Sequence, residues 1–130
     1  MITDQDIHDG HWKKTWKIPN TQWTLKGYSR AAYRTGFYIL ELNIMLDAGP
    51  QNFNKPDHIF ITHSHFDHIC GLPLTMIGDE HGDHIFHIYA PTESEKFIRS
   101  YLNSSFSLNA CHGVNIKSWF EFHPMEPKKE

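Results

Sequence analysis

Thr62-His63-Ser64-His65-Phe66-Asp67-His68 decides the fold of this chain, because it gathers three imidazoles and a carboxylate within six consecutive positions. The stretch directly follows a short apolar run. Side chains of an extended segment alternate between its two faces, so His63, His65 and Asp67 are expected on one side, and a turn brings His68 back to join them. Imidazole nitrogen and carboxylate oxygen are usual ligands for zinc and related metals. The H-x-H-x-D-H spacing therefore predicts a metal site.

The composition indicates a single globular domain with a modest core. The chain has 130 residues, of which 39% are hydrophobic and 14% aromatic. Its net charge of -3 gives no overall attraction to phosphate backbones or anionic membranes. Three lysines, Lys13, Lys14 and Lys17, are interleaved with tryptophans, and we interpret this cluster as an amphipathic edge because three charges are too few to dominate nucleic-acid binding.

Cysteine usage and the first residues bear on the compartment. Cys70 and Cys111 allow one disulfide but indicate no disulfide framework. Residues 1–6 are acidic and polar, unlike a secretory signal, and no stretch approaches membrane-spanning length. We expect an intracellular protein, cytoplasmic or nuclear, with no membrane association.

The pattern of apolar residues and turns predicts an α/β domain. A lead-in over residues 1–20 precedes short strands within 22–46, which end at the turn Asp47-Ala48-Gly49-Pro50. We then expect, in order, a buried strand over 58–62, the histidine motif as its loop, a helix from 71 to 77, a strand over 85–90, a helix over 91–102 and a strand over 114–122 that breaks at Pro124. Ligands at the carboxyl ends of strands are typical of α/β sheets.

The motif and its surroundings resemble a known family. His63-Ser64-His65-Phe66-Asp67-His68, followed by Gly71-Leu72-Pro73, resembles the signature of the metallo-β-lactamase superfamily, and more closely its ribonuclease Z branch, the tRNA 3′-processing endonucleases. Upstream, Gly27-Tyr28-Ser29 and Met45-Leu46-Asp47-Ala48-Gly49 resemble the first hairpin and the strand that ends in Asp and Gly in that family. The resemblance covers the chain from about Gly27 onward.

This resemblance implies a fold and a domain organisation. The family fold is an αββα sandwich of two similar halves, and the chain resembles the first half: a mixed sheet with helices on one face. It implies one truncated domain over residues 1–130, with a lead-in at 1–20, the half-sandwich at 21–127 and a charged tail at 128–130.

The family pattern also implies ligands. It assigns His63 and His65 to one zinc, and Asp67 and His68 to the other. Asp47 is expected behind them, either as a carboxylate that orients an imidazole or as a capping residue of its turn, and both interpretations stay open. One or two zinc ions are expected, with manganese or iron as alternatives.

The implied chemistry is metal-assisted hydrolysis, in which Asp67 binds metal, orients the attacking water and transfers a proton. The implied substrate is a tRNA precursor, so RNA is an expected partner. Other phosphodiesters, carboxylic esters and thioesters stay open because the metal motif is shared among them.

The sequence departs from the family pattern in its ligand count. The family's later ligands fall beyond the region that this sequence resembles, which leaves two ligands for each metal where a catalytic zinc generally has three. Substitutes among the remaining histidines are His112 and His123, with His81, His84 and His87 nearer the motif. Phe66 is a further departure, because the branch commonly has glycine there. A phenylalanine narrows access to the metals or stacks on a base.

Two functional hypotheses follow. In the first, the chain is a ribonuclease Z-like zinc-dependent hydrolase that needs a complementary C-terminal half. In the second, it is a catalytically inactive half-fold that serves as a binding or partner module. Both predict that the uncovered sheet face leads to self-association or to binding of the complementary half.

Overall fold

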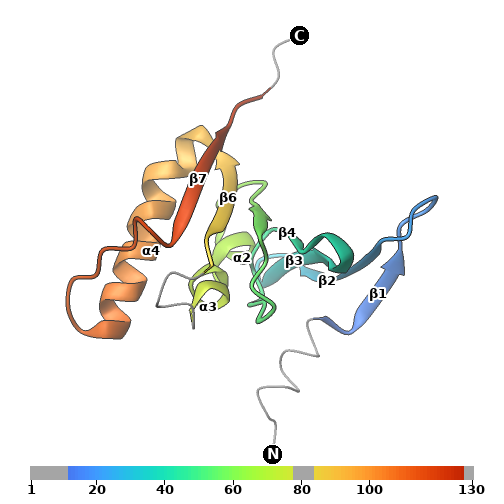
Figure 1. Cartoon of the computed structure of the whole chain (residues 1–130), viewed down its shortest axis with the longest axis horizontal. Coiled ribbons are helices and arrows are strands. Elements are labelled where there is room, and N and C mark those ends of the chain that lie inside the picture. The colour runs from blue at the N-terminus through green and yellow to red at the C-terminus, as the bar shows by residue number, and fades with distance from the viewer. Residues whose placement is uncertain (1–11, 78–83, 128–130) are drawn as a thin grey trace, which may run out of the picture.

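The computed structural model describes residues 12–77 and 84–127. Predictions that concern most of the 1–20 lead-in, the candidate ligand His81 and the 128–130 tail lie outside these residues. The described residues contain one seven-stranded sheet in the order β1-β2-β3-β4-β5-β6-β7 (Figure 1). The strands are β1 (Lys14–Lys17), β2 (Thr24–Arg30), β3 (Arg34–Ile39), β4 (Ile44–Leu46), β5 (His58–Phe60), β6 (Phe86–Pro91) and β7 (Phe120–Met125).

The pairing of neighbouring strands changes from antiparallel to parallel at β4. Strands β1 to β4 pair antiparallel, and β4 to β7 pair parallel. Parallel neighbours need a crossover connection, which the helices supply between β5 and β6 and between β6 and β7. The helical segments are η1 (Leu40–Leu42), α2 (Phe66–Ile69), α3 (Leu72–Met76), η2 (Thr92–Ser94) and α4 (Glu95–Ala110).

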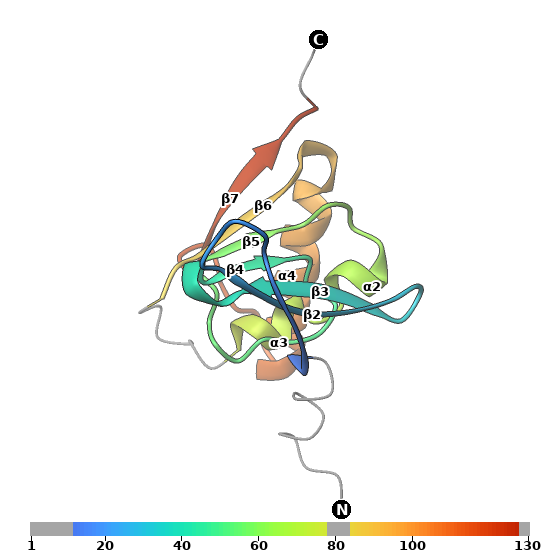
Figure 2. The same ribbon diagram turned by 90° about the vertical axis from the view of Figure 1, so that its right-hand side faces the viewer.

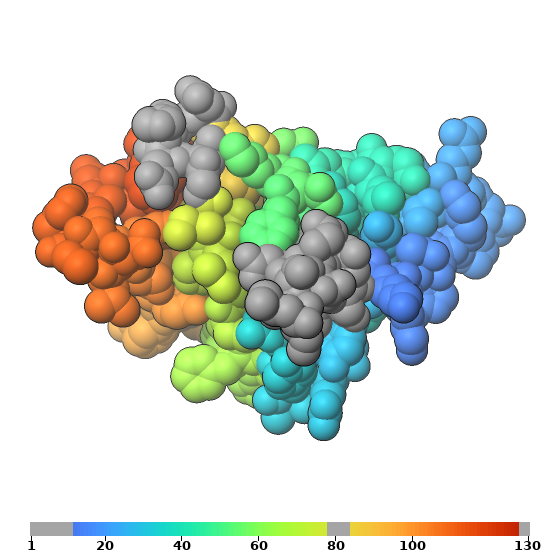
Figure 3. Space-filling view, turned by 90° about the horizontal axis from the view of Figure 1, so that it is seen from below, coloured from blue at the N-terminus to red at the C-terminus, as the bar shows by residue number. Residues whose placement is uncertain are grey.

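The helices lie on one face of the sheet, and the core lies between the two layers (Figure 2). Strand β6 shows the alternation most clearly, since Phe86, Ile88 and Ala90 are buried while His87 and Tyr89 on the other face are half-buried. The buried helix residues include Leu72, Met76, Ile98, Leu102 and Phe106. Seen from below, α3 lies between α4 and the N-terminal strands (Figure 3). The predicted fold class, a mixed α/β sheet with helices on one face, is confirmed.

Three elements differ from the sequence prediction. The motif, expected as a loop, contains the short helix α2, and α4 continues beyond residue 102 to Ala110. The extension is explained by Phe106, which is buried and contacts Trp119 edge-on at 4.9 Å between ring centroids. The last strand, expected over 114–122 and ended by Pro124, is instead β7 from Phe120 to Met125, which contains Pro124. Because β7 is an edge strand, a proline without a backbone N–H is tolerated there.

Candidate metal centre

The motif brings its four polar residues together at the carboxyl end of β5. His63 and His65 lie in the extended segment after the strand, with their ring centroids 4.5 Å apart. The His63 and His68 ring centroids are 4.1 Å apart, and Asp67 Oδ2 lies 3.3 Å from His68 Nε2. Asp67 lies near the histidines as expected, but not through the alternation of an extended segment. Asp67 and His68 belong to the short helix α2.

Asp47 lies behind the motif and contacts His68. Asp47 is 6% exposed, and its Oδ2 lies 3.0 Å from His68 Nδ1. The buried His68 Nδ1 has no aligned hydrogen-bond partner within the described residues, so this contact is an ion-pair distance rather than a well-directed bond. Facing Nδ1 towards Asp47 leaves Nε2 facing Asp67. A carboxylate behind a histidine in this way fixes the ring orientation and raises the basicity of the other nitrogen.

Thr62 holds the Asp47 carboxylate in place. Asp47 Oδ1 accepts hydrogen bonds from the Thr62 backbone N–H at 2.8 Å and from Thr62 Oγ1 at 3.0 Å. Thr62 Oγ1 also lies 3.0 Å from His63 Nδ1. Thr62 was not predicted from the sequence as part of the site, although its place between the strand and the first histidine was a usable signal. Asp47 itself has φ 60, a left-handed conformation that aspartate tolerates better than most residues.

Two glycines let the Asp47 turn pack directly on the motif. A Cβ added to Gly49 would lie 2.1 Å from the Asp67 carbonyl oxygen and 2.5 Å from the Thr35 nitrogen. A Cβ added to Gly71 would lie 2.3 Å from the Gly49 carbonyl oxygen. The backbones also bond, since the Ala48 N–H donates to the His68 carbonyl at 2.7 Å. The turn and α2 therefore form one closely packed unit.

Helix α4 supports α2 from the other side. The Tyr101 hydroxyl donates a hydrogen bond to the Cys70 carbonyl at 3.0 Å, at the end of α2. Burial raises the pKa of Tyr101 above its ordinary value, so the tyrosine keeps the proton that this bond needs. Cys70 itself contacts the Gly49 carbonyl through Sγ at 3.4 Å, which places the thiol behind the motif.

The ligand atoms of Asp67 and His68 are spaced as a pair that suits zinc. Two ligand atoms held about 2 Å from a tetrahedral zinc lie about 3.3 Å apart, and the Asp67 to His68 separation is 3.3 Å. Within residues 12–77 and 84–127, no third histidine, cysteine or acidic ligand converges with a motif pair within 4.8 Å. The expected substitutes among the described histidines do not join the motif. His87 and His123 instead lie together with Glu121, and His112 contacts the Gly113 carbonyl.

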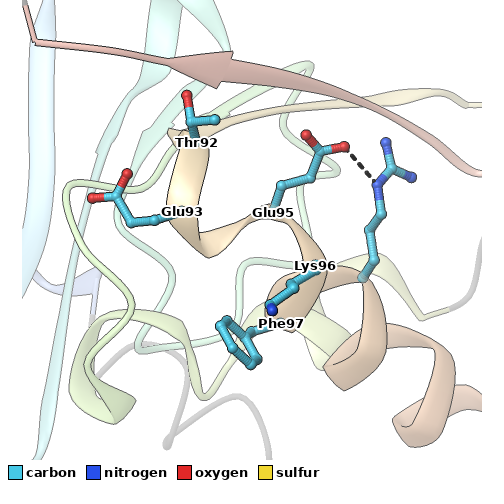
Figure 4. Close-up of a pocket in the computed structure, with 6 residues that line it drawn as sticks. Thr92, Glu93, Glu95, Lys96 and Phe97 are labelled. Atoms are coloured by element: carbon cyan, nitrogen blue, oxygen red, sulfur yellow. Dashed lines mark hydrogen bonds and ion pairs between the residues drawn. The ribbon is translucent and has the colours of Figure 1, made fainter.

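The surface beside the motif is aromatic. Phe66, in α2, is 87% exposed, and with Phe97 and Tyr101 it borders a shallow hollow of about 220 Å³. Ser94 donates a hydrogen bond to Ser64 at 3.2 Å and ties the motif to the start of α4. A wider hollow of about 580 Å³ lies on that helix, where Glu95 and Arg99 form an ion pair at 2.9 Å (Figure 4). It is lined by residues of η2 and α4 alone and contains no motif residue.

Comparison with known proteins agrees with this geometry. The family model described as "Beta-lactamase superfamily domain" matches residues 41–128. The chain belongs to the β-lactamase superfamily. The matched region contains the motif, Asp47, α2 to α4 and the parallel strands, so the resemblance to the metallo-β-lactamase fold is confirmed.

The similar curated proteins are named Ribonuclease Z. One from Prochlorococcus marinus strain AS9601 is 50% identical over 50 residues, which is 37% of this chain and 16% of the relative. One from Prochlorococcus marinus subsp. pastoris is 48% identical over 50 residues, which again is 37% of this chain and 16% of the relative. The match therefore spans about a sixth of these relatives. None of the described helices is long and apolar enough to cross a membrane.

Proposed function

We propose that this β-lactamase superfamily chain contributes a two-metal ligand set to a ribonuclease Z-like phosphodiesterase. His63 and His65 hold one zinc, Asp67 and His68 hold the other, and Asp47 orients His68. The observation that carries the proposal is the convergence of these side chains at the end of β5, with the His68 ring directed by Asp47. The names of the similar proteins support the ribonuclease Z assignment.

The metals supply Lewis acidity when bound, which makes hydroxide available near neutral pH and polarises a phosphoryl oxygen. The chain's own residues set the geometry. Thr62 holds Asp47, and Asp47 faces His68 Nδ1, so His68 Nε2 is the nitrogen that would bind a metal together with Asp67. Asp67 is half-buried in the first turn of α2. We propose that its carboxylate accepts a proton from the attacking water.

The pairwise arrangement of the ligands explains why we assign this chain a partial set. A stable catalytic zinc generally has three protein ligands, and each motif pair supplies two. We propose that the remaining ligands come from a complementary C-terminal half, which packs on the sheet face opposite the helices. The proposed domain organisation is accordingly a half-sandwich over residues 21–127.

The proposed substrate is the 3′ end of a tRNA precursor. Phe66 lies in the first turn of α2 beside Asp67, and its exposed ring presents a face on which a nucleobase can stack. Its exposure favours base stacking over a role in the packing of the site. A Phe66→Ala variant separates the two roles, since loss of stacking weakens RNA binding and leaves metal binding unchanged.

The test is cleavage of a tRNA precursor with a 3′ trailer, and of a simple aryl phosphodiester, by the zinc-loaded chain with and without a complementary superfamily half. We expect trailer release in the presence of the complementary half, little release without it, and loss of release when a chelator is added. Asp67→Ala should lower the rate at least about 100-fold, because it removes a ligand and the proton acceptor together. Equal rates for the wild type and Asp67→Ala would contradict the proposal and favour the inactive binding module.

A further inference from the structure

A second cluster of metal-binding groups lies on the sheet face opposite the helices. His87 Nδ1 is 3.0 Å from His123 Nε2, and both nitrogens face the Glu121 carboxylate, with Oε2 3.5 Å from His87 and 3.8 Å from His123. Within the described ranges it is the one group of three such ligands whose atoms all lie within 4.8 Å of one another. No residue of the histidine motif takes part.

The sheet register creates this cluster. His87 pairs with Glu121 across β6 and β7, and Tyr89 pairs with His123 two residues further on. Residues two apart in a strand share a face, so two paired strands bring all three ligands to one surface. The spacing of His87 and His123 in the sequence gives no sign of this, and from the sequence they were considered only as substitute ligands for the motif.

Ring stacking fixes both imidazoles. The His87 ring stacks on His58 at 5.1 Å, and the His123 ring stacks on Tyr89 at 4.6 Å. The far ends of these two stacks are joined, because His58 Nδ1 lies 3.0 Å from the Tyr89 hydroxyl. A site whose ligands are held in place by their neighbours loses little side-chain freedom when it binds an ion.

We propose that His87, Glu121 and His123 form a divalent metal site that is distinct from the histidine motif. Two imidazoles and one carboxylate suit zinc, and cobalt, nickel and copper accept the same ligands. The three separations bracket the distance of about 3.3 Å expected between ligands of a tetrahedral ion. In the chain on its own, without the proposed complementary half, the Glu121 side chain is 59% exposed, so the ion reaches the site from solvent, and a fourth position stays open for water or another ligand.

The test compares metal binding by the full chain and by single-residue variants. Cobalt titration with visible absorption reports the number of sites and their coordination. His123→Ala and Glu121→Gln should each remove one equivalent or weaken it more than about 100-fold, because even loss of an outer-shell partner costs about 10- to 100-fold. His112→Ala, an exposed histidine outside the cluster, is the matched control and should bind like the wild type.

A second measurement separates this site from the motif. In NMR spectra of the histidine side chains, added zinc should shift the resonances of His87 Nδ1 and His123 Nε2. The shifts should be as large in the His63→Ala variant as in the wild type. Circular dichroism shows whether each variant is folded. The proposal is overturned if folded His123→Ala and Glu121→Gln bind cobalt as the wild type does, or if zinc leaves both ring nitrogens unshifted. In that case the His87 to His123 contact is a hydrogen bond between imidazoles and no more.

Discussion

Among single residues, the orientation of His68 decides which of its ring nitrogens can bind a metal. Its Nδ1 faces the buried Asp47 carboxylate at 3.0 Å, and its Nε2 faces Asp67 at 3.3 Å. Asp47 is fixed by the backbone and hydroxyl of Thr62. The two sequence interpretations of Asp47, as a turn residue and as an orienting carboxylate, are therefore compatible with each other. The turn conformation is what directs the carboxylate to His68.

Replacing Asp47 with asparagine should weaken zinc binding at the motif about 10- to 100-fold, the usual effect of losing an outer-shell carboxylate. The side chain keeps its shape, so the fold should persist. Competition with a chromophoric chelator measures the affinity. Asp57→Asn changes an exposed aspartate away from the motif and is the matched control. If the two variants bind zinc with equal affinity, Asp47 has only a structural role in its turn.

Among the elements, the Asp47 turn and α4 both pack against α2 and hold the motif in position. Gly49→Ala places a Cβ within 2.5 Å of backbone on two sides, and backbone cannot move aside as a flexible side chain can. We expect a loss of about 1–3 kcal/mol in the free energy of unfolding, the usual cost of overpacking. Urea denaturation measures it. Gly113→Ala, whose added Cβ meets nothing within 4 Å, should change stability little.

The Tyr101 bond to the end of α2 adds a pH dependence. Burial raises the pKa of Tyr101, so the folded state keeps the phenol proton to higher pH than the unfolded state does. This stabilisation is present below about pH 10, the ordinary tyrosine value, and is lost as pH rises through the raised pKa. Tyr101→Phe should cost about 1 kcal/mol at neutral pH. The difference from the wild type should shrink in alkaline solution, as followed by denaturation against pH.

The sequence predicted the elements whose signals are local. The motif, the Asp47 turn and the alternation of β6 can each be recognised within a few consecutive residues. Helix α2 was missed because one turn is too short to show a period, and the end of α4 was missed because Trp119, which covers Phe106, is distant in sequence. The His87 cluster was missed for the same reason, since it depends on the register of two parallel strands.

In the molecule as a whole, no described helix covers the sheet face opposite α2, α3 and α4. Two rows of half-buried and exposed side chains cross it, graded from apolar on β3 and β4 to histidine and glutamate on β7. Their members, in register, are Phe37, Leu46, Phe60, Tyr89 and His123 in one row, and Ile39, Ile44, His58, His87 and Glu121 in the other. In a solution of the purified chain, a second copy is a partner that could cover this face.

We therefore expect the purified chain to self-associate through this face. Light scattering over a range of concentrations should show a mass that rises above that of the monomer. Phe60→Lys places a charge at the centre of the first row and should shift the equilibrium towards monomer, whereas Leu108→Lys, on an exposed position of α4, should not. A wild-type mass that stays monomeric at every concentration would contradict this expectation.

Metal binding by the histidine motif can be measured as zinc bound by the chain after its second cluster has been removed. In the His123→Ala background, equilibrium dialysis followed by elemental analysis should show zinc bound to the folded chain. Adding His63→Ala should remove at least half of it, because one of the two ligand pairs is lost. Metal binding by the motif would be contradicted by a His123→Ala chain that binds no zinc above background, or by bound zinc that stays unchanged when His63→Ala is added.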